Sequence, residues 1–206
     1  MLSRGADGMR RCWWCGVDPL YVAYHDTEWG RPVREDRRLF EKICLEGFQS
    51  GLSWLTILRK RENFRRAFLD FDFEALARRD GRFVDRLVQD AGIVRHRGKI
   101  ESVLNNAKRA RELAKEPGGL SDFLWSYAPP ARKKFSGIAP TSPESAALSK
   151  ELRRRGWSFV GPTTLHAFQQ ATGMVNDHLP GCFARAGCQR RHIGARIPVA
   201  KPRRVS

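Results

Sequence analysis

The stretch of sequence that decides the fold is residues 90–110, DAGIVRHRGKIESVLNNAKRA. Its second half carries the longest apolar stripe at helical spacing in the chain. The stripe consists of Ile100, Val103, Leu104, Ala107 and Ala110. Its first half contains Gly92 and Gly98 and follows a shorter apolar pattern over residues 83–88, for which Gly92 is the expected C-terminal stop. The stretch therefore predicts two helices joined by a glycine-bearing turn.

Helical patterns continue on both sides of this unit. Further helices are expected over residues 39–47, over 55–68, over 73–79 with Asp72 as cap, over 122–127 with Ser121 as cap, over 142–156 beginning with Ser142-Pro143, and over 163–172. We find no repeat and no hairpin dipeptide between alternating strands. We therefore predict an all-α fold, with its main loops at Gly118-Gly119 and residues 128–143.

Composition limits the class of protein. The chain has 206 residues, with 38 Lys and Arg against 22 Asp and Glu, which gives a formal net charge of +16. That length suits one domain or two small halves around a cleft. No apolar run reaches the roughly 18 residues of a membrane span, and the N-terminus lacks the apolar core of a secretory signal. We expect a soluble, cytoplasmic protein with a polyanionic partner such as nucleic acid, although a basic surface kept for solubility gives the same composition.

The positive charge is concentrated near the C-terminus. Residues 183–206 contain seven Lys and Arg and no acid, whereas residues 1–11 contain three Arg and one Asp. The C-terminal segment also has prolines and glycines and no clear apolar periodicity, which is typical of a flexible basic arm that can hold phosphates. A poorly ordered terminus with no dedicated role is the alternative.

Cysteine and histidine form two short pairs at opposite ends of the chain. Cys12 and Cys15 form a C-x2-C pair, His178 and Cys182 form an H-x3-C pair, and His25 lies between them. Zinc prefers four tetrahedral thiolate and imidazole ligands, and a closely spaced pair supplies two of them from one local turn. One ion could therefore join the two terminal segments, while reduced cysteines with a core or surface histidine are the alternative.

Longer motifs lie between these pairs. They are Asp18-Pro19-Leu20-Tyr21, Tyr24-His25-Asp26, Glu28-Trp29-Gly30, Cys44-Leu45-Glu46-Gly47, Gly51-Leu52-Ser53-Trp54, Arg61-Glu62-Asn63, the run from Ala91 to Ile100, and Val175-Asn176-Asp177-His178. Over roughly residues 10–183 the chain closely resembles the DNA-3-methyladenine glycosylase I family of bacterial base-excision repair. The resemblance implies a helix-hairpin-helix-type all-α glycosylase fold. It divides the chain into a basic N-terminal extension (1–11), a glycosylase domain (12–183) and a flexible basic tail (184–206).

The resemblance also implies one structural zinc ion that joins the N- and C-terminal segments. The family's ligands fall on Cys12, His25, His178 and Cys182. Cys15 and Cys188 then become free thiols, although Cys15 is close enough in sequence to compete with Cys12.

The residues that would recognise a damaged base follow from the same resemblance. Glu46 would contact the flipped base as the catalytic residue, Tyr24 and Trp54 would stack on it, Tyr21 would close the pocket, and Gln49 would be a polar neighbour. Adenine methylated at N3 is cationic, so aromatic rings and a carboxylate suit its recognition. Core packing is the alternative for the aromatic residues, and a solvated place on the helix surface is the alternative for Glu46.

The glycine-bearing turn is the expected anchor for the DNA backbone. Glycine lets backbone N–H groups approach a phosphate, and the following helix N-terminus favours an anion. The expected DNA contacts are Gly92, Ile93, Val94, Arg95, Arg97, Gly98 and Lys99. A plain turn with solvated basic residues is the alternative. Residues 51–53 are candidates to fill the gap left by a flipped nucleotide.

Together these features predict an enzyme that flips 3-methyladenine out of double-stranded alkylated DNA and hydrolyses its N-glycosidic bond. We expect a monofunctional glycosylase, because no lysine is placed for a lyase step, and a monomer in the bacterial cytoplasm with no membrane partner. No aspartate is evident that would activate water. The alternatives are a non-enzymatic, zinc-stapled DNA-binding protein and a glycosylase of the same fold with a different lesion range. Phe48 favours the last, since a polar residue is expected there in relatives.

Overall fold

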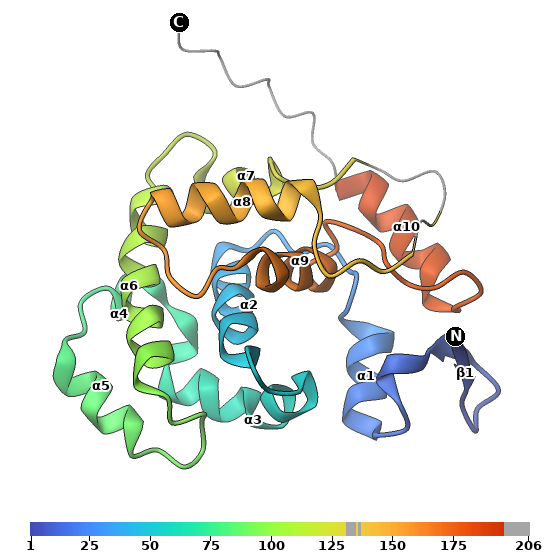
Figure 1. The fold of residues 1–206 in the computed structure, drawn as a ribbon, viewed down its shortest axis with the longest axis horizontal. Coiled ribbons are helices and arrows are strands. Elements are labelled where there is room, and N and C mark those ends of the chain that lie inside the picture. Colours follow the sequence, from blue (N-terminus) through green and yellow to red (C-terminus); the bar gives the residue numbers. More distant parts are fainter. Residues whose placement is uncertain (131–134, 136, 196–206) are drawn as a thin grey trace, which may run out of the picture.

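α-Helices make up most of the part of the chain that the computed structural model describes, which is residues 1–130, 135 and 137–195. They pack around a helix at the centre of the molecule, α2 (Figure 1). In chain order they are α1 (Pro19–Thr27), α2 (Asp36–Gln49), α3 (Trp54–Ala67), α4 (Phe73–Leu76), α5 (Gly81–Val88), α6 (Arg97–Leu113), α7 (Gly119–Trp125), α8 (Pro143–Arg154), α9 (Pro162–Ala171) and α10 (Ala184–Ala195). Two single-turn 3-10 helices, η1 (Trp13–Cys15) and η2 (Leu69–Phe71), complete the helical elements of the described residues.

The helix–turn–helix unit is present as α5, a connecting turn and α6. The side chain of His96 begins α6 by accepting a hydrogen bond from the backbone N–H of Lys99. The prediction that Gly92 is the C-terminal stop of α5 is wrong, because α5 ends at Val88 and Gly92 has no left-handed φ. Gly92 is instead a close-approach position: an added Cβ would lie 2.9 Å from the Asp90 carboxylate and 3.2 Å from the Asn63 amide. The turn is therefore pressed against α3.

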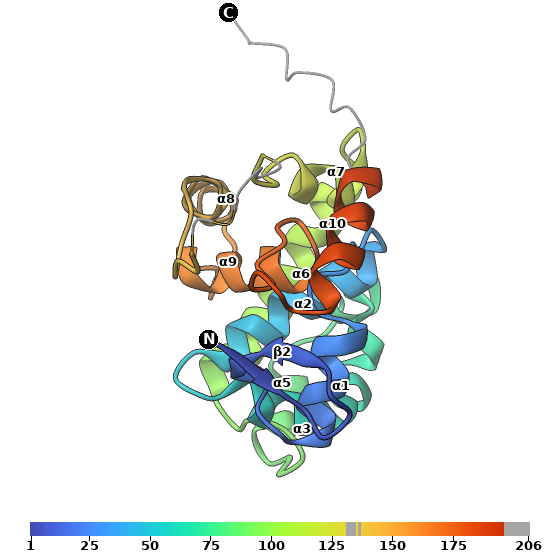
Figure 2. The same ribbon diagram turned by 90° about the vertical axis from the view of Figure 1, so that its right-hand side faces the viewer.

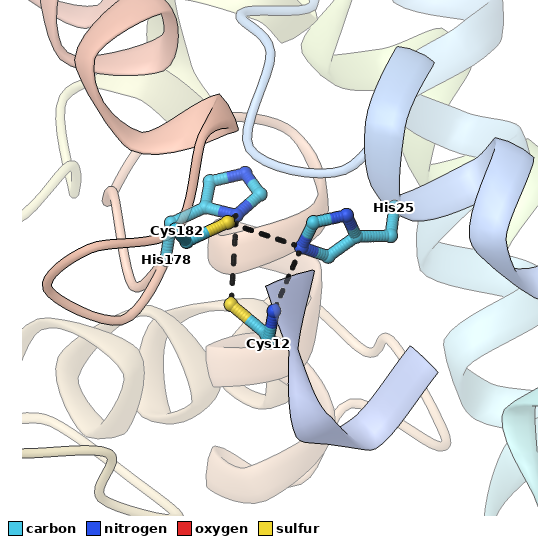
Figure 3. Close-up of side chains that lie close together, drawn as sticks. All are labelled: Cys12, His25, His178 and Cys182. Carbon is cyan, nitrogen blue, oxygen red and sulfur yellow. Dashed lines mark hydrogen bonds between the residues drawn. The ribbon is translucent and has the colours of Figure 1, made fainter. Parts of the chain in front are cut away.

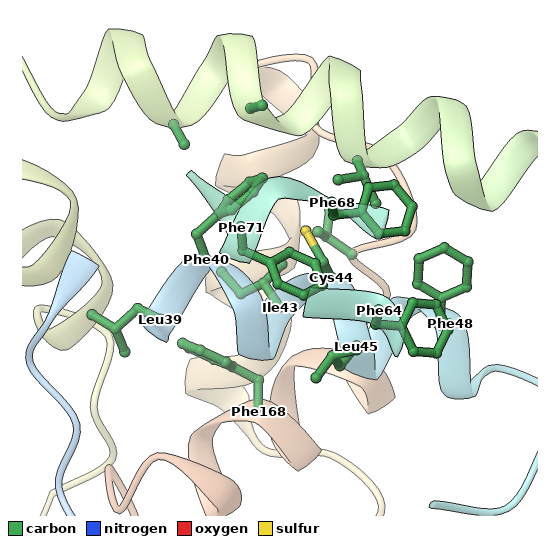
Figure 4. Close-up of a cluster of buried hydrophobic side chains, with 14 of the residues drawn as sticks. Leu39, Phe40, Ile43, Cys44, Leu45, Phe48, Phe64, Phe68, Phe71 and Phe168 are labelled. Carbon is green, nitrogen blue, oxygen red and sulfur yellow. The ribbon is translucent and has the colours of Figure 1, made fainter. Parts of the chain in front are cut away.

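The central helix α2 is buried on most of its surface and packs against α3, α6 and α9. Phe48 is 1% exposed, and its ring centroid lies 4.6 Å from that of Phe64 and 5.8 Å from that of Phe68 (Figure 4). Cys44 is buried in the same core. Phe48 thus belongs to the core, and its burial removes the support that it gave to a different lesion range.

Local capping explains where several of the other helices begin. Ser142 caps α8 in a reciprocal capping box and Asp72 caps α4, as the sequence predicts. The expected cap at Ser121 is wrong, since α7 begins directly after Gly118, which has the left-handed φ of 85° that glycine adopts without strain. The Ser121 N–H donates instead to Oδ1 of Asp36 at 2.9 Å and thereby ties α7 to the start of α2.

The described residues are mostly helical, as predicted, and the N-terminal segment adds one short hairpin that the sequence did not predict. The strands β1 (Leu2–Arg4) and β2 (Arg10–Cys12) pair as an antiparallel hairpin. Asp7-Gly8 lies in its turn, and Gly8 takes a φ of 79°. Asp-Gly is a favoured hairpin dipeptide, but strands of three residues leave no alternating pattern by which to recognise it.

Helix α10 corrects the prediction of a flexible tail over residues 184–206. Ala184 and Cys188 are buried, and the side-chain amide of Asn176 donates to the carbonyl oxygen of Arg185 at 3.0 Å. Both views place α10 above α1 and the N-terminal hairpin (Figures 1 and 2). The rest of the predicted tail, residues 196–206, lies outside the described residues.

Among the described residues, no helix combines the length and the apolar character that crossing a bilayer requires.

Candidate functional site

Four buried side chains from distant parts of the chain meet beside the N-terminal hairpin (Figure 3). Cys12 ends β2, His25 lies on α1, and His178 and Cys182 lie between α9 and α10. Two sulfur atoms and two ring nitrogens, one from each residue, all lie within 4.8 Å of one another. The structure thus brings together the four residues that the resemblance implies, and this metal cluster could hold an ion.

The distances within the metal cluster suit a tetrahedral ion. The Cys182 Sγ lies 3.5 Å from Nε2 of His25 and 3.6 Å from Nδ1 of His178, and the Cys12 Sγ lies 3.7 Å from Nδ1 of His178. Tetrahedral zinc, with bonds of about 2.3 Å to sulfur and about 2.0 Å to nitrogen, holds neighbouring sulfur and nitrogen ligands about 3.5 Å apart. The donor set and the spacing therefore both fit zinc.

The two ring nitrogens that point away from the metal cluster are also held. The His25 Nδ1 lies 2.7 Å from Oδ1 of Asp26, and the His178 Nε2 lies 3.2 Å from the carbonyl oxygen of Trp29. Arg11 of β2, itself buried, donates to the same Asp26 carboxylate at 2.8 to 3.1 Å. Outer contacts of this kind fix the orientation of ligand rings and leave the inner nitrogen free for a metal.

The neighbouring cysteines stay outside the metal cluster. The Sγ of Cys15 lies 3.1 Å from the carbonyl oxygen of Cys12, and the Sγ of Cys188 lies 3.9 Å from the carbonyl oxygen of Trp29. Both are buried free thiols, as expected. Among the described residues, the group that could hold a metal therefore consists of the four predicted ligands.

A cavity of about 180 Å³ lies beside the metal cluster, and we name it the base cavity. All five residues that the sequence singled out for base recognition line it, namely Tyr21, Tyr24, Glu46, Gln49 and Trp54. The sequence did not reveal the further lining residues Trp14, Trp29, Ile138, Ala167 and Gln170. Trp29 is part of the quoted Glu28-Trp29-Gly30 motif and Trp14 lies inside the C-x2-C pair, which is a usable signal. The last three residues reach the cavity only through tertiary packing.

Glu46 is the charged centre of the base cavity. Its side chain is on the inner face of α2 and is 5% exposed. Burial raises the pKa of Glu46 to about 7, and the nearby positive charge of Lys42 opposes this rise. No residue that the structure describes donates a hydrogen bond to its carboxylate. Burying a carboxylate without a hydrogen-bond donor costs free energy, and a cationic or hydrogen-bonding ligand would offset that cost.

Two rings form one side of the base cavity, and we name them the aromatic wall. The ring centroids of Tyr24 on α1 and Trp54 at the start of α3 lie 5.4 Å apart at 43°. The Nε1 of Trp54 is buried and has no hydrogen-bond partner in the described part of the chain. Tyr21 adds a third ring 6.4 Å from Tyr24, and burial raises its pKa to about 12, which keeps its phenol neutral. A flat aromatic ligand can stack on these faces.

A second hollow, of about 280 Å³, adjoins the base cavity and shares Glu46, Gln49 and Ala167 with it. The loop between α2 and α3 lines this hollow through residues 50–52, and Leu52 is 42% exposed there. The structure therefore places residues 51–53 beside the approach to the base cavity.

The glycine-bearing turn presents part of the expected DNA contacts at the surface. Arg95 and Arg97 are exposed, although Arg97 also forms a 2.7 Å ion pair with Asp85. The backbone N–H groups of Arg97 and Gly98 lie in the first turn of α6, where a helix leaves them without an internal acceptor. Ile93 and Val94 pack inward, so only their backbone could face a phosphate.

Lys99 has a different role from the one expected. Its side chain is 7% exposed, and its ammonium donates to the carbonyl oxygens of Phe48 at 2.9 Å and Ser50 at 2.6 Å. The structure thus corrects the expectation that Lys99 adds free positive charge beside the turn. Lys99 instead joins the start of α6 to the end of α2.

The described fold and base cavity define a helical protein that can hold a flat, cationic group between aromatic rings and a carboxylate. Comparison with known sequences makes this more specific. A family model for methyladenine glycosylase matches residues 14–185. DNA-3-methyladenine glycosylase 1 of Escherichia coli strain K12 is 47% identical over 184 residues, which is 87% of this chain and 98% of that protein. DNA-3-methyladenine glycosylase of Haemophilus influenzae is 45% identical over 177 residues, 84% of this chain and 96% of that protein.

Solved structures agree with these sequence matches. A crystal structure of 3-methyladenine DNA glycosylase I has a TM-score of 0.82 and 46% identity, covering 85% of this chain and 99% of that one. A structure of the Staphylococcus aureus enzyme, which concerns its recognition of 3-methyladenine, has a TM-score of 0.81 and 36% identity over 85% of this chain and 96% of that one. The chain belongs to the methyladenine glycosylase family.

Proposed function

We propose that this protein is a DNA glycosylase that removes 3-methyladenine from alkylated DNA by hydrolysing the N-glycosidic bond. Family membership supports this function, and the structural observation that carries it is Glu46. Its buried carboxylate has no hydrogen-bond donor among the described residues and faces a cavity lined by aromatic rings. A base that is positively charged and carries an amino group supplies both the charge and the donor that this carboxylate lacks.

The lesion itself explains why such a site is sufficient. Methylation at N3 makes adenine a cation and a good leaving group, so the enzyme has less need of acid catalysis than for a normal base. It must instead extract the nucleotide from the duplex and hold the base. We assign stacking to the aromatic wall, closure of the cavity to Tyr21, and a polar contact to Gln49.

Cleavage of the bond leaves positive charge on the sugar. An oxocarbenium-like sugar is stabilised by nearby negative charge, which DNA phosphates and a preorganised pocket supply. Glu46 is the one carboxylate among the described lining residues of the base cavity. We therefore assign Glu46 the recognition of the base and the electrostatic stabilisation of the reaction, and no separate water-activating carboxylate.

We further propose that the metal cluster holds one structural zinc ion. Cys12, His25, His178 and Cys182 would be its ligands, and the spacing of their donor atoms supports this choice of metal. The ion would tie the N-terminal hairpin and α1 to the segment that leads into α10, and it would take no part in the chemistry.

The partner that we propose is double-stranded alkylated DNA, bound by a monomer in the bacterial cytoplasm. Exposed Arg95 and Arg97 and the N–H groups at the start of α6 support a phosphate contact at the glycine-bearing turn. The exposed Leu52, at the approach to the base cavity, supports a role for residues 51–53 in filling the gap in the duplex.

The test of the function is the release of bases from methylated duplex DNA by the purified protein, followed by chromatography. Free 3-methyladenine as the main product is the expected result. Release of 7-methylguanine in similar amounts would show a broader lesion range. Tight DNA binding without any released base would contradict the proposal and favour a non-enzymatic DNA-binding protein.

A further inference from the structure

Lys42 lies directly behind the aromatic wall. Its ammonium donates to the hydroxyl oxygen of Tyr24 at 3.0 Å and lies 4.6 Å from the ring centroids of both Tyr24 and Trp54. A lysine ammonium within about 6 Å of a ring face is held by the ring quadrupole. One cation therefore contacts both rings on which we propose that the base stacks.

The two faces of the aromatic wall meet different surroundings. Tyr24 and Trp54 line the base cavity, whereas Lys42 lines a separate cavity of about 280 Å³ on the other side. Glu28 and Arg61 also line that second cavity, and Arg61 donates to both oxygens of Glu28 at 2.5 and 3.0 Å. Lys42 is thus not among the described lining residues of the base cavity, and it can act there only through Tyr24, Trp54 and Glu46.

Lys42 is also one helical turn before Glu46 on α2, a spacing at which side chains are neighbours. We infer that Lys42 is a positioning residue for base excision, which holds Tyr24 in place and keeps Glu46 negatively charged for a cationic base. This inference rests on the proposed function, because it assigns Lys42 a part in that same reaction.

The charges around the pair determine the direction of the effect. Burial raises the pKa of Glu46 and Lys42 lowers it; burial also lowers the pKa of Lys42 to about 8, and Glu46 opposes that change. The other charged groups that act on Lys42 are Glu28 beyond α1, Glu41 on α2 and Arg61 on α3. Three further cations line the same second cavity as Lys42, namely Arg31, Arg38 on α2 and Arg65 on α3. On the side of the base cavity, the phenols of Tyr21 and Tyr24 on α1 and the uncharged Ala167 and Gln170 on α9 face the pair.

Removing the positive charge of Lys42 therefore raises the pKa of Glu46 further. A larger fraction of Glu46 is then neutral at pH 7, and a neutral carboxyl no longer complements a cationic base. The hydrogen bond has a second effect. An ammonium can only donate, so the Tyr24 oxygen accepts from Lys42. This hydrogen bond holds the outer end of the Tyr24 ring in its place in the aromatic wall.

The experiment compares the wild type with Lys42→Met, which keeps an unbranched apolar stem, and with Lys42→Arg, which keeps the charge. Single-turnover release of 3-methyladenine is measured from about pH 5.5 to 9. We expect the acid limb to move to higher pH by about one unit in Lys42→Met, which slows excision roughly five-fold at pH 7 and much less at pH 9. Lys42→Arg should keep the acid limb of the wild type.

A titration without substrate tests the same inference independently of turnover. The Glu46 carboxyl is followed by carbon NMR in glutamate-labelled protein and assigned with Glu46→Gln. Its midpoint should be higher in Lys42→Met than in the wild type. Lys150→Met, which removes an exposed lysine from α8, is the control for loss of one positive charge and should change neither profile.

The outcomes separate this inference from the proposed function. A folded Lys42→Met protein with an unchanged acid limb and an unchanged Glu46 midpoint would overturn the role of Lys42. An equal loss of rate at every pH, with an unchanged Glu46 midpoint, would overturn the effect of Lys42 on the charge of Glu46, because loss of the hold on Tyr24 alone has no pH signature. A wild type that releases no base would overturn the proposed function, and the NMR midpoint would still decide whether Lys42 sets the charge of Glu46.

Discussion

The metal cluster and the base cavity are neighbours, yet they treat polar groups in opposite ways. In the metal cluster, both outward ring nitrogens meet an oxygen, and the Asp26 carboxylate is bound by Arg11. In the base cavity, Glu46 lacks a donor and the Trp54 N–H lacks an acceptor within the described part of the chain. Buried polar groups usually find partners, so the exceptions mark where a ligand is needed. The metal cluster therefore satisfies its own polar groups, whereas the base cavity needs a ligand to do so.

The complete region also supports the incomplete one. Tyr24 and His25 are consecutive on α1, so one helix carries a ring of the aromatic wall and a ligand of the metal cluster. Trp14 lines the base cavity and lies 5.2 Å from the His25 ring, while Trp29 lines it and lies 4.6 Å from the His178 ring. A rigid support of this kind holds a binding site in its productive geometry.

Breaking the complete region should have the largest effect. Cys182→Ala removes one ligand, so we expect loss of bound zinc and a fall in unfolding free energy of about 4 kcal/mol, or a drop in Tm of roughly 10 °C or more. Metal analysis and thermal unfolding check this. Cys188→Ala, which removes a buried thiol outside the metal cluster, should keep its zinc and lose only about 1 kcal/mol. Full zinc content in Cys182→Ala would contradict the assignment.

Breaking the incomplete region should impair chemistry and leave stability nearly intact. Glu46→Gln keeps the shape of the side chain and removes its charge, so we expect single-turnover release of 3-methyladenine to fall by about 10²-fold or more. Its thermal stability should be equal to or above that of the wild type, because a buried carboxylate without a hydrogen-bond donor is gone. The exposed Glu74→Gln on α4 is the matched control. An unchanged rate in Glu46→Gln would remove Glu46 from the reaction.

A smaller effect is expected from a variant that weakens the outer contacts of the metal cluster without removing one of its four ligands. Asp26→Asn weakens the hold on the His25 ring and removes one of the two ionic partners of Arg11, the other being Asp7, so we expect metal affinity to fall by about 10- to 100-fold. Competition with a chelator measures this affinity. The control is Asp122→Asn on α7, which alters a surface ion pair with Arg34 and should not change the metal affinity. Equal affinity in Asp26→Asn and wild type would show that the outer contact is dispensable.

The smallest expected effect lies outside both regions, at the glycine-bearing turn. Arg95→Ala removes one exposed charge, so the slope of log Kd for duplex DNA against log salt concentration should decrease by about one. Lys99→Met should instead lower thermal stability and leave the slope unchanged, because the Lys99 ammonium is already bound to two carbonyl oxygens. A slope that responds to Lys99→Met and not to Arg95→Ala would reverse this assignment.

The sequence predicted most helices and the residues closest to the chemistry. Tyr21, Tyr24, Glu46 and Trp54 lie within a short span of chain, where motif and helical spacing are informative, and the structure gathers them around one cavity. Capping predictions held where a serine or aspartate directly precedes a helix, as at Ser142. They failed at Ser121, because a glycine nearby could begin the helix earlier.

The sequence could not predict features that depend on contacts between distant residues. Gly187, Gly194 and the lack of a regular apolar stripe give residues 184–195 little helical signal, and α10 is held by contacts such as that of Asn176 with Arg185. Lys99 and the exposed Arg95 are both basic residues of the glycine-bearing turn, so the sequence does not distinguish them. The difference is the contact of Lys99 with the end of α2. Lys42 likewise reads as an ordinary helix lysine until α1 and α3 place two rings against it.

The metal cluster also sets an order of events during synthesis. Cys12 and His178 are 166 residues apart in the chain, so two of the donors leave the ribosome long after the first. The helical core around α2 can begin to form before then, because a domain folds as its segments emerge. Capture of the proposed zinc ion would then close a very long loop late in maturation, because a nascent chain that ends before His178 has only half of the four ligands.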